Sequence, residues 1–161
     1  MRARWEGIGI GATLLFAVIG LQRLEAASAS SVVHLSATVA PACQVTAPSL
    51  DFGEYDPLGI HETSPLDAEC RVRVTCTRSV SASLQLSPQR GTAADASLIS
   101  GSDELFYAIF RDAGRLDPWA DLPLDGGGSR TVEVPLYARI YGAQDVPSGD
   151  YQDTVIVRLD F

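Results

Sequence analysis

Apolar and polar residues alternate with a period of two along most of this chain, and no other feature constrains its fold as strongly. The alternation is clear in residues 70–76 (CRVRVTC), 80–87 (VSASLQLS) and 131–141 (TVEVPLYARIY), while 105–110 (LFYAIF) is apolar on both faces. Successive side chains of a β-strand point to opposite faces, so these segments predict strands. Turns rich in Gly, Pro and Asp separate them, no segment repeats with a period of 3.6, and Pro135 predicts a bulge or an edge position. We expect one all-β domain folded as a β-sandwich.

Two more alternating segments lie near the ends of this expected domain. Residues 154–161 (TVIVRLDF) run to the last residue of the sequence, and one side of the run is Val155, Val157, Leu159 and Phe161. Residues 31–39 (SVVHLSATV) are ended by Pro41, and one side of that run is Val33, Leu35, Ala37 and Val39. We expect both to be strands without a partner in their own domain. The alternative for 31–39 is an ordinary first strand paired within its own domain.

Residues 1–29 have the organisation of a secretory signal peptide. Arg2 and Arg4 precede an apolar run, and Ala27-Ser28-Ala29 matches a small-residue cleavage site. The run is shorter than the roughly 20 apolar residues that span a bilayer, so we expect no integral membrane segment after cleavage. The predicted route is export through the Sec pathway to the periplasm.

The charge of the chain excludes one class of partner. The formal net charge is −8, and removing 1–29, which holds three Arg and two Glu, makes it one unit more negative. Binding to phosphate groups requires clustered Lys and Arg, so we expect no nucleic-acid partner.

Three cysteines in an exported chain predict one disulfide and one free thiol. Cys70 and Cys76 are six residues apart in one predicted strand, which puts their Cα atoms roughly 20 Å apart, beyond the reach of a disulfide. Cys43 therefore pairs with Cys76 or with Cys70. Because Cys70 shares its side of the strand with Val72 and Val74, we expect it to point inward.

Residues able to support catalysis or metal binding are sparse. His34 and His61 have no metal-ligand spacing, and we expect them to be exposed. The acidic loop 111–130 could be a calcium loop or a paired-carboxylate site, but its spacing fits neither, and a solvated loop is the better interpretation. The carboxylates concerned are Asp112, Asp117, Asp121 and Asp125. We expect no enzyme activity, no metal and no cofactor.

Four segments resemble the spore coat protein U domain family, whose members include subunits of archaic, Csu-type chaperone–usher pili. They are ACQVTAPSLDFGEYDPLG (42–59), RVTCT (73–77), LFYAIFRDAGRLDPWAD (105–121) and, most specifically, ARIYGAQDVPSGDYQDTVIVRLDF (138–161). The resemblance covers nearly all of 31–161. It implies a disulfide between Cys43 and Cys76, although the additional Cys70 departs from the family pattern.

The resemblance also implies how such a chain would work. The fold would be an immunoglobulin-like sandwich lacking its last strand, with residues 30–41 as an N-terminal donor strand and 42–161 as the pilin domain. The strand with Val155, Val157, Leu159 and Phe161 would contact a periplasmic chaperone. An outer-membrane usher and neighbouring copies or related pilus subunits would be the other partners, in a surface fibre used for adhesion or biofilm formation.

Two alternatives of other classes remain at this stage. One is a monomeric exported sandwich that binds carbohydrate, with Trp119 and Tyr107 as stacking platforms. The other is a spore or cell-surface coat protein.

Overall fold

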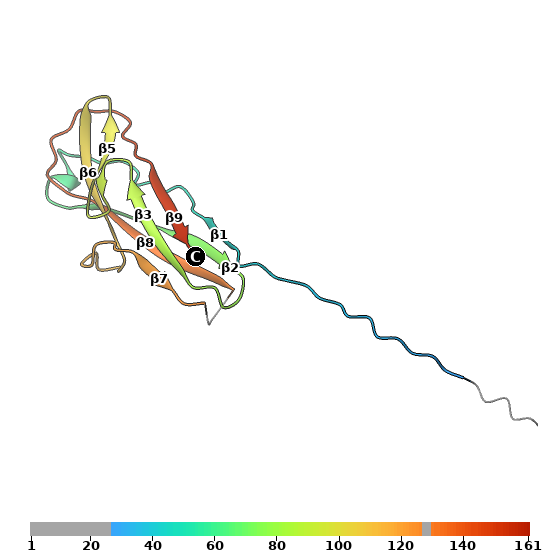
Figure 1. Cartoon of the computed structure of the whole chain (residues 1–161). Coiled ribbons are helices and arrows are strands. Elements are labelled where there is room, and N and C mark those ends of the chain that lie inside the picture. Colours follow the sequence, from blue (N-terminus) through green and yellow to red (C-terminus); the bar gives the residue numbers. More distant parts are fainter. Residues whose placement is uncertain (1–26, 127–129) are drawn as a thin grey trace, which may run out of the picture. The chain divides into compact units, whose positions relative to one another are not determined.

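The computed structural model describes residues 27–126 and 130–161, and the first 26 residues of the predicted signal peptide lie outside this range. The described residues form strands and one short 3-10 helix, with no α-helix (Figure 1). The elements are β1 (Cys43–Thr46), η1 (Ile60–Glu62), β2 (Leu66–Cys76), β3 (Ala82–Pro88), β4 (Gly91–Thr92), β5 (Asp95–Ser100), β6 (Asp103–Phe110), β7 (Leu122–Leu124), β8 (Thr131–Ile140) and β9 (Val155–Asp160). No helix in the described ranges is long and apolar enough to cross a membrane.

The chain divides into two units, Met1–Ala37 and Thr38–Phe161. Residues 27–37, the described part of the first unit, form no strand, and their side chains are exposed. The second unit contains every strand and the hydrophobic core.

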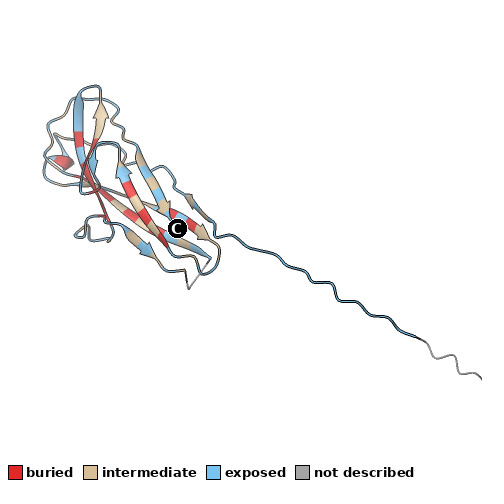
Figure 2. Cartoon of the chain, in the orientation of Figure 1, coloured by how far each residue is buried: buried red, intermediate tan, exposed pale blue. Residues whose placement is uncertain are grey.

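Two antiparallel sheets make up the second unit. One has the strand order β1-β2-β8-β6-β5-β4, and the other has the order β7-β3-β9. The shared core takes Val72, Val134 and Leu136 from the larger sheet and Leu84 and Leu86 from the smaller one. Figure 2 shows the buried residues along β2, β3, β6 and β8. The predicted all-β sandwich is confirmed.

The alternation seen in the sequence determines which side of each strand is buried. In β2, Val72 and Val74 are buried whereas Arg71 and Arg73 are exposed. In β6 the prediction of burial on both faces holds from Tyr107 to Phe110 but is wrong at Phe106, which is 46% exposed.

Pro135 lies within β8, where it pairs with Arg71 of β2 in an unbroken register. The expected bulge is therefore absent. β6 pairs with β8 only from Tyr137 to Ile140, so β6 has ended before Pro135 is reached. β8 lies between β2 and β6, so it is not an edge strand, but Pro135 lies outside its stretch paired with β6 and its missing N–H leaves no β6 group unsatisfied.

Candidate functional site

Each of the two sheets ends in an edge strand on the same side of the domain. β1 is the outer strand of one sheet and β9 is the outer strand of the other, and each pairs with a single neighbour in the described residues. The two strands approach one another to within 8 Å between Cα atoms (Figure 1). Unpaired strand edges present free backbone N–H and C=O groups that can bind another strand. We call this side of the domain the open edge.

β9 lies at the open edge with an apolar inner row, which we define as Val155, Val157 and Leu159. These side chains are half-buried against the core, whereas Ile156, Arg158 and Asp160 are exposed. The expectation that this strand has no partner in its own domain is wrong, because the other edge of β9 pairs with β3, with Leu159 opposite Leu84 and Val157 opposite Leu86. The structure thus brings together three of the four predicted C-terminal residues. Phe161 lies just after the strand and is 60% exposed.

Burial decreases from β8 toward the open edge. Leu136, Ala138 and Ile140 of β8 are buried, but their cross-strand partners in β2 are only half-buried. Those partners are Cys70, Ala68 and Leu66. β1 pairs with β2 only from Arg73 to Cys76, so this half of β2 has no strand on its outer side. The apolar side of the larger sheet is therefore incompletely covered next to the open edge.

A disulfide joins β1 to β2 in the half of β2 that pairs with β1. Cys43 and Cys76 are direct cross-strand partners, with a Cα–Cα distance of 4.0 Å. The pairing implied by the family resemblance is confirmed, and the alternative with Cys70 is wrong. Cys70 is a free thiol that packs half-buried against the core, as its position in the strand predicts. Burial raises the pKa of this thiol.

A cleft of about 900 Å³ continues the open edge beyond the N-terminal end of β9. Residues between 50 and 58, which follow β1, line one side, and residues 146–153, which precede β9, line the other. Leu98, Leu105 and Ile140 complete the lining. The cleft therefore lies between the chain segments that adjoin the two edge strands.

Tyr107 connects both sides of this cleft to β6. Its hydroxyl donates a 2.6 Å hydrogen bond to Asp153 Oδ2, and its ring packs edge-on against Phe52 with 6.1 Å between centroids. Burial, together with the Asp153 carboxylate, raises the pKa of the Tyr107 hydroxyl well above its ordinary value. The sequence pointed to Tyr107 only as a sugar-stacking platform in the carbohydrate-binding alternative, and it singled out neither Phe52 nor Asp153, although Asp153 belongs to the motif GDYQDTV that precedes the last strand.

His61 corrects one expectation. It is buried, its ring stacks on Tyr55 with 5.0 Å between centroids, and its Nδ1 accepts a hydrogen bond from the Asp56 N–H. The Tyr55 hydroxyl in turn donates to the Tyr141 carbonyl and accepts from the Gln144 N–H. His61 is therefore a packing residue that holds the loop after β1 against the loop after β8. His34 is exposed, as expected.

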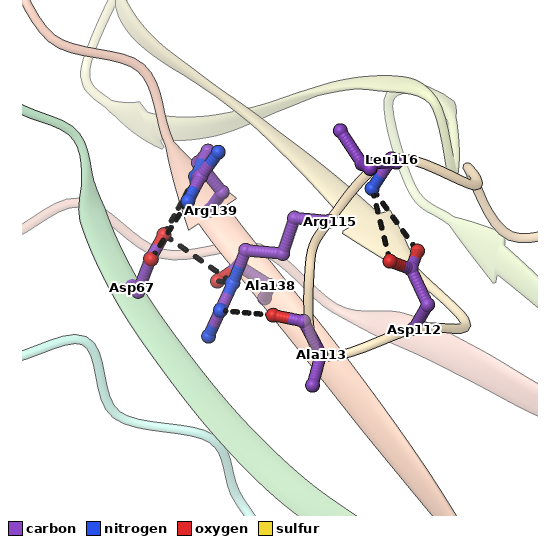
Figure 3. Close-up of polar contacts among 7 residues, drawn as sticks. All are labelled: Asp67, Asp112, Ala113, Arg115, Leu116, Ala138 and Arg139. Carbon is purple, nitrogen blue, oxygen red and sulfur yellow. Dashed lines mark hydrogen bonds and ion pairs between the residues drawn. The ribbon is translucent and has the colours of Figure 1, made fainter.

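The acidic loop is held by internal contacts (Figure 3). Asp112 accepts hydrogen bonds from the N–H groups of Asp117 and Leu116, which lower the pKa of its carboxyl. Arg115 donates to the carbonyls of Ala113 and Ala138. These contacts fold the loop onto the outer side of β8.

The remaining polar contacts of this region are also structural. Asp117 pairs with Arg111, and Asp121 accepts a hydrogen bond from Gln85. Asp67 accepts two hydrogen bonds from Arg139 and pairs with Arg115 (Figure 3). Across the described ranges, no group of three or more His, Cys, Asp or Glu side chains is arranged to hold a metal ion.

The carbohydrate-binding alternative relied on two exposed aromatic rings. Trp119 is 7% exposed and Tyr107 is 3% exposed, and both belong to the core. Stacking on a sugar requires an accessible ring face, so these two platforms do not exist.

The family model of the spore coat protein U domain matches residues 29–158 of the chain. The chain belongs to the spore coat protein U domain family. The resemblance noted in the sequence is thereby confirmed, and this domain accounts for almost the whole sandwich.

Two relatives of this spore coat protein U domain are informative. This chain is 28% identical to Protein U of Myxococcus xanthus over 171 aligned residues, which cover 92% of this chain and 94% of that protein. Its fold is similar to a chain in the CsuC–CsuE chaperone–tip adhesion subunit pre-assembly complex from the archaic chaperone–usher Csu pili of Acinetobacter baumannii. That match has a TM-score of 0.57 and 24% identity and covers 77% of this chain. Our chain spans 40% of the length of that protein.

Proposed function

We propose that this protein is an exported structural subunit of a surface pilus, assembled by a chaperone–usher route through donor-strand exchange. The observation that carries the proposal is the open edge, where the free outer edges of β1 and β9 lie beside each other and the inner row of β9 is only half-buried. An added strand would pair with free backbone groups and cover this apolar row, which is the physical basis of recognition by strand addition. Family membership and the fold shared with a Csu pilus chaperone–subunit complex support the same role.

The proposed donor is residues 30–41, preceding a pilin domain of residues 42–161. Val33, Leu35, Ala37 and Val39 repeat with a period of two, and their side chains are exposed. A strand with this pattern presents one continuous apolar side to a sheet edge. In the proposal, a periplasmic chaperone first contacts β9 and Phe161 at the open edge. The apolar side of the donor strand from a neighbouring copy or a related subunit then replaces the chaperone there.

The remaining parts of the proposal follow from the assembly route. Residues 1–29 act as the signal peptide for Sec export, the subunit passes through the periplasm and an outer-membrane usher, and the fibre serves adhesion or biofilm formation. The role is structural and uses no catalytic residue or cofactor.

Binding of the donor segment as a free peptide tests the proposal. The acceptor is the full chain with Leu35→Asp, which disables its own donor segment and leaves the sandwich unchanged. A peptide of residues 30–40 (SSVVHLSATVA) is added, and the melting temperature is followed. A ligand that binds only the folded state stabilises it in proportion to the logarithm of its concentration.

We expect a concentration-dependent rise in melting temperature with the native peptide. The matched controls are peptides with Leu35→Asp, which breaks the apolar side, and Ser36→Asp, which adds the same charge on the other side. Only the Ser36→Asp peptide should stabilise the acceptor. No stabilisation by the native peptide, or equal effects of the two Asp peptides, contradicts the donor-strand function.

A further inference from the structure

The segment that leads into β9 crosses from one sheet to the other within three residues. Gln152 pairs with Ile99 of β5 through two backbone hydrogen bonds of 2.8 and 3.1 Å, so it belongs to the larger sheet. Val155 pairs with Pro88 of β3 in the smaller sheet. The chain therefore changes sheets at Asp153 and Thr154.

Asp153 is fixed at this crossing by both of its carboxylate oxygens. Oδ2 accepts the 2.6 Å hydrogen bond from Tyr107, and Oδ1 accepts a 2.7 Å hydrogen bond from the Thr154 N–H. Tyr107 is itself rigidly placed, because it is buried in β6 between its cross-strand partners Ala96 and Ile140. The hydrogen bond thus ties the start of β9 to a fixed point in the opposite sheet.

The sequence of β9 does not select its own register on β3. Alternation prevents a shift by one residue, which would bury Arg158 and Asp160. A shift by two residues keeps the parity and places Val157, Leu159 and Phe161 where Val155, Val157 and Leu159 now lie. This shift would also bury Phe161, which is 60% exposed in the observed register. The shift exchanges Val155 for Phe161 in this row, so neither parity nor burial excludes it, and a contact outside β9 has to select the register.

We propose that the Tyr107–Asp153 hydrogen bond selects the register of β9 and thereby positions Val155, Val157 and Leu159 at the open edge. Tyr107 and Asp153 are positioning residues, since neither pairs with the added strand. The significance of this register for strand addition rests on the proposed function, whereas the register itself is a property of the folded chain.

Disulfide trapping in the full chain measures the register directly. In a Cys70→Ser background, Ser87→Cys with Ile156→Cys joins positions that face each other in the observed register. Ser87→Cys with Arg158→Cys joins positions that face each other only after the shift by two. All three positions are exposed, so the substitutions leave the core intact. The quantity measured is the rate of disulfide formation between positions 87 and 158 divided by the rate between positions 87 and 156, both under mild oxidation.

We expect Tyr107→Phe to raise this ratio about tenfold, because the loss of one buried hydrogen bond changes the population of a minor state by about that factor. Asp153→Ala should raise it at least as much, because it also removes the hydrogen bond from the Thr154 N–H. The double variant should add little to Asp153→Ala, since Tyr107→Phe removes a bond that Asp153→Ala has already removed. The matched control is Tyr55→Phe, which removes a hydroxyl with two hydrogen bonds elsewhere on the cleft. Its ratio should equal that of the wild type.

An unchanged ratio in both Tyr107→Phe and Asp153→Ala, or an equal rise in Tyr55→Phe, overturns the proposal.

Adding the 30–40 peptide to the Tyr107→Phe chain with Leu35→Asp gives the functional readout. The peptide should lower the ratio toward the wild-type value, because only the observed register accepts it. If the peptide binds and the ratio stays high, the register has no role in acceptance and that part of the proposal is wrong. If the peptide does not bind the wild-type acceptor, the proposed function fails, while the ratio without peptide still decides whether Tyr107 selects the register.

Discussion

Cys70 and Leu136 are direct cross-strand partners on the same side of the larger sheet, yet they differ in burial. Leu136 is 6% exposed, whereas Cys70 is only half-buried and carries a free thiol. The difference marks the boundary between the covered core and the open edge, and it makes Cys70 a natural reporter of whether that edge is occupied.

The Cys70 thiol should react slowly with a maleimide and become less reactive when the 30–40 peptide binds. Burial raises its pKa, so the fraction present as the reactive thiolate at pH 7–8 is lower than for an ordinary thiol and increases as the pH rises. The rate is measured by mass spectrometry at several pH values, with and without the peptide. A thiol placed by Ser87→Cys in a Cys70→Ser background, on the exposed side of β3, is the control and should not be protected. Equal protection of both thiols would show that the effect is not local to the open edge.

Loss of the disulfide should destabilise the sandwich strongly. Cys43 and Cys76 are separated by 33 residues, and removal of a bridge from a small exported domain costs about 2–5 kcal/mol. Urea unfolding of Cys43→Ser should show this loss. Cys70→Ser is the control, and it should retain the bridge in peptide mapping and lose much less stability. A Cys70→Ser variant as unstable as Cys43→Ser would contradict the structural role given to the bridge.

A charge on the inner row of β9 should prevent capture by a periplasmic chaperone. Leu159→Asp places a carboxylate among half-buried apolar side chains, where an unpaired charge is strongly unfavourable. Arg158→Asp, one residue away on the exposed side, is the matched control. Co-purification with a co-expressed chaperone should be lost in the first variant and kept in the second. Capture of both variants would mean that the inner row of β9 does not contact the chaperone.

Polymer formation should depend on the apolar side of residues 30–40. Burying Val33, Leu35 and Val39 contributes at most about 5–9 kcal/mol at roughly 1.5–3 kcal/mol for each large side chain, comparable to the stability of a small domain. The chain with Leu35→Asp should therefore remain monomeric in light scattering, whereas Ser36→Asp should assemble. Assembly of the Leu35→Asp chain would count against the donor role of this segment.

The ion pair at Asp67 should contribute to stability only above acidic pH. The hydrogen bonds from Arg139, 2.7 and 2.9 Å long, lower the pKa of Asp67 in the folded state. The contribution is therefore present above the ordinary pKa of Asp, about 3.9, and is lost as the pH falls through the lowered value. In urea unfolding, the stability difference between wild type and Arg139→Gln should shrink between about pH 5 and pH 2. Arg90→Gln, the same change at an exposed site, should show no comparable trend.

Several features of the fold could be predicted from sequence because they depend on local periodicity. The side chains that β2 and β8 bury follow from alternation alone, since a strand has only two sides and one is apolar. Trp119, His61 and Phe106 could not be assigned in this way. His61 carries two polar ring nitrogens and Trp119 an indole N–H, which favour the surface, yet both are buried in the folded domain, whereas nothing in the described part of the domain fully covers Phe106.

The sequence by itself determined that the chain forms strands, which side of each strand is apolar, and that 31–39 and 154–161 carry such sides. The tertiary structure decided that β1 and β9 become neighbouring unpaired edges, because strand order depends on contacts between residues far apart in the chain. It also decided the register of β9, since its apolar row fits β3 equally well after a shift by two residues. The Tyr107–Asp153 bond joins residues 46 positions apart, and a periodic pattern carries no information about a contact of that range.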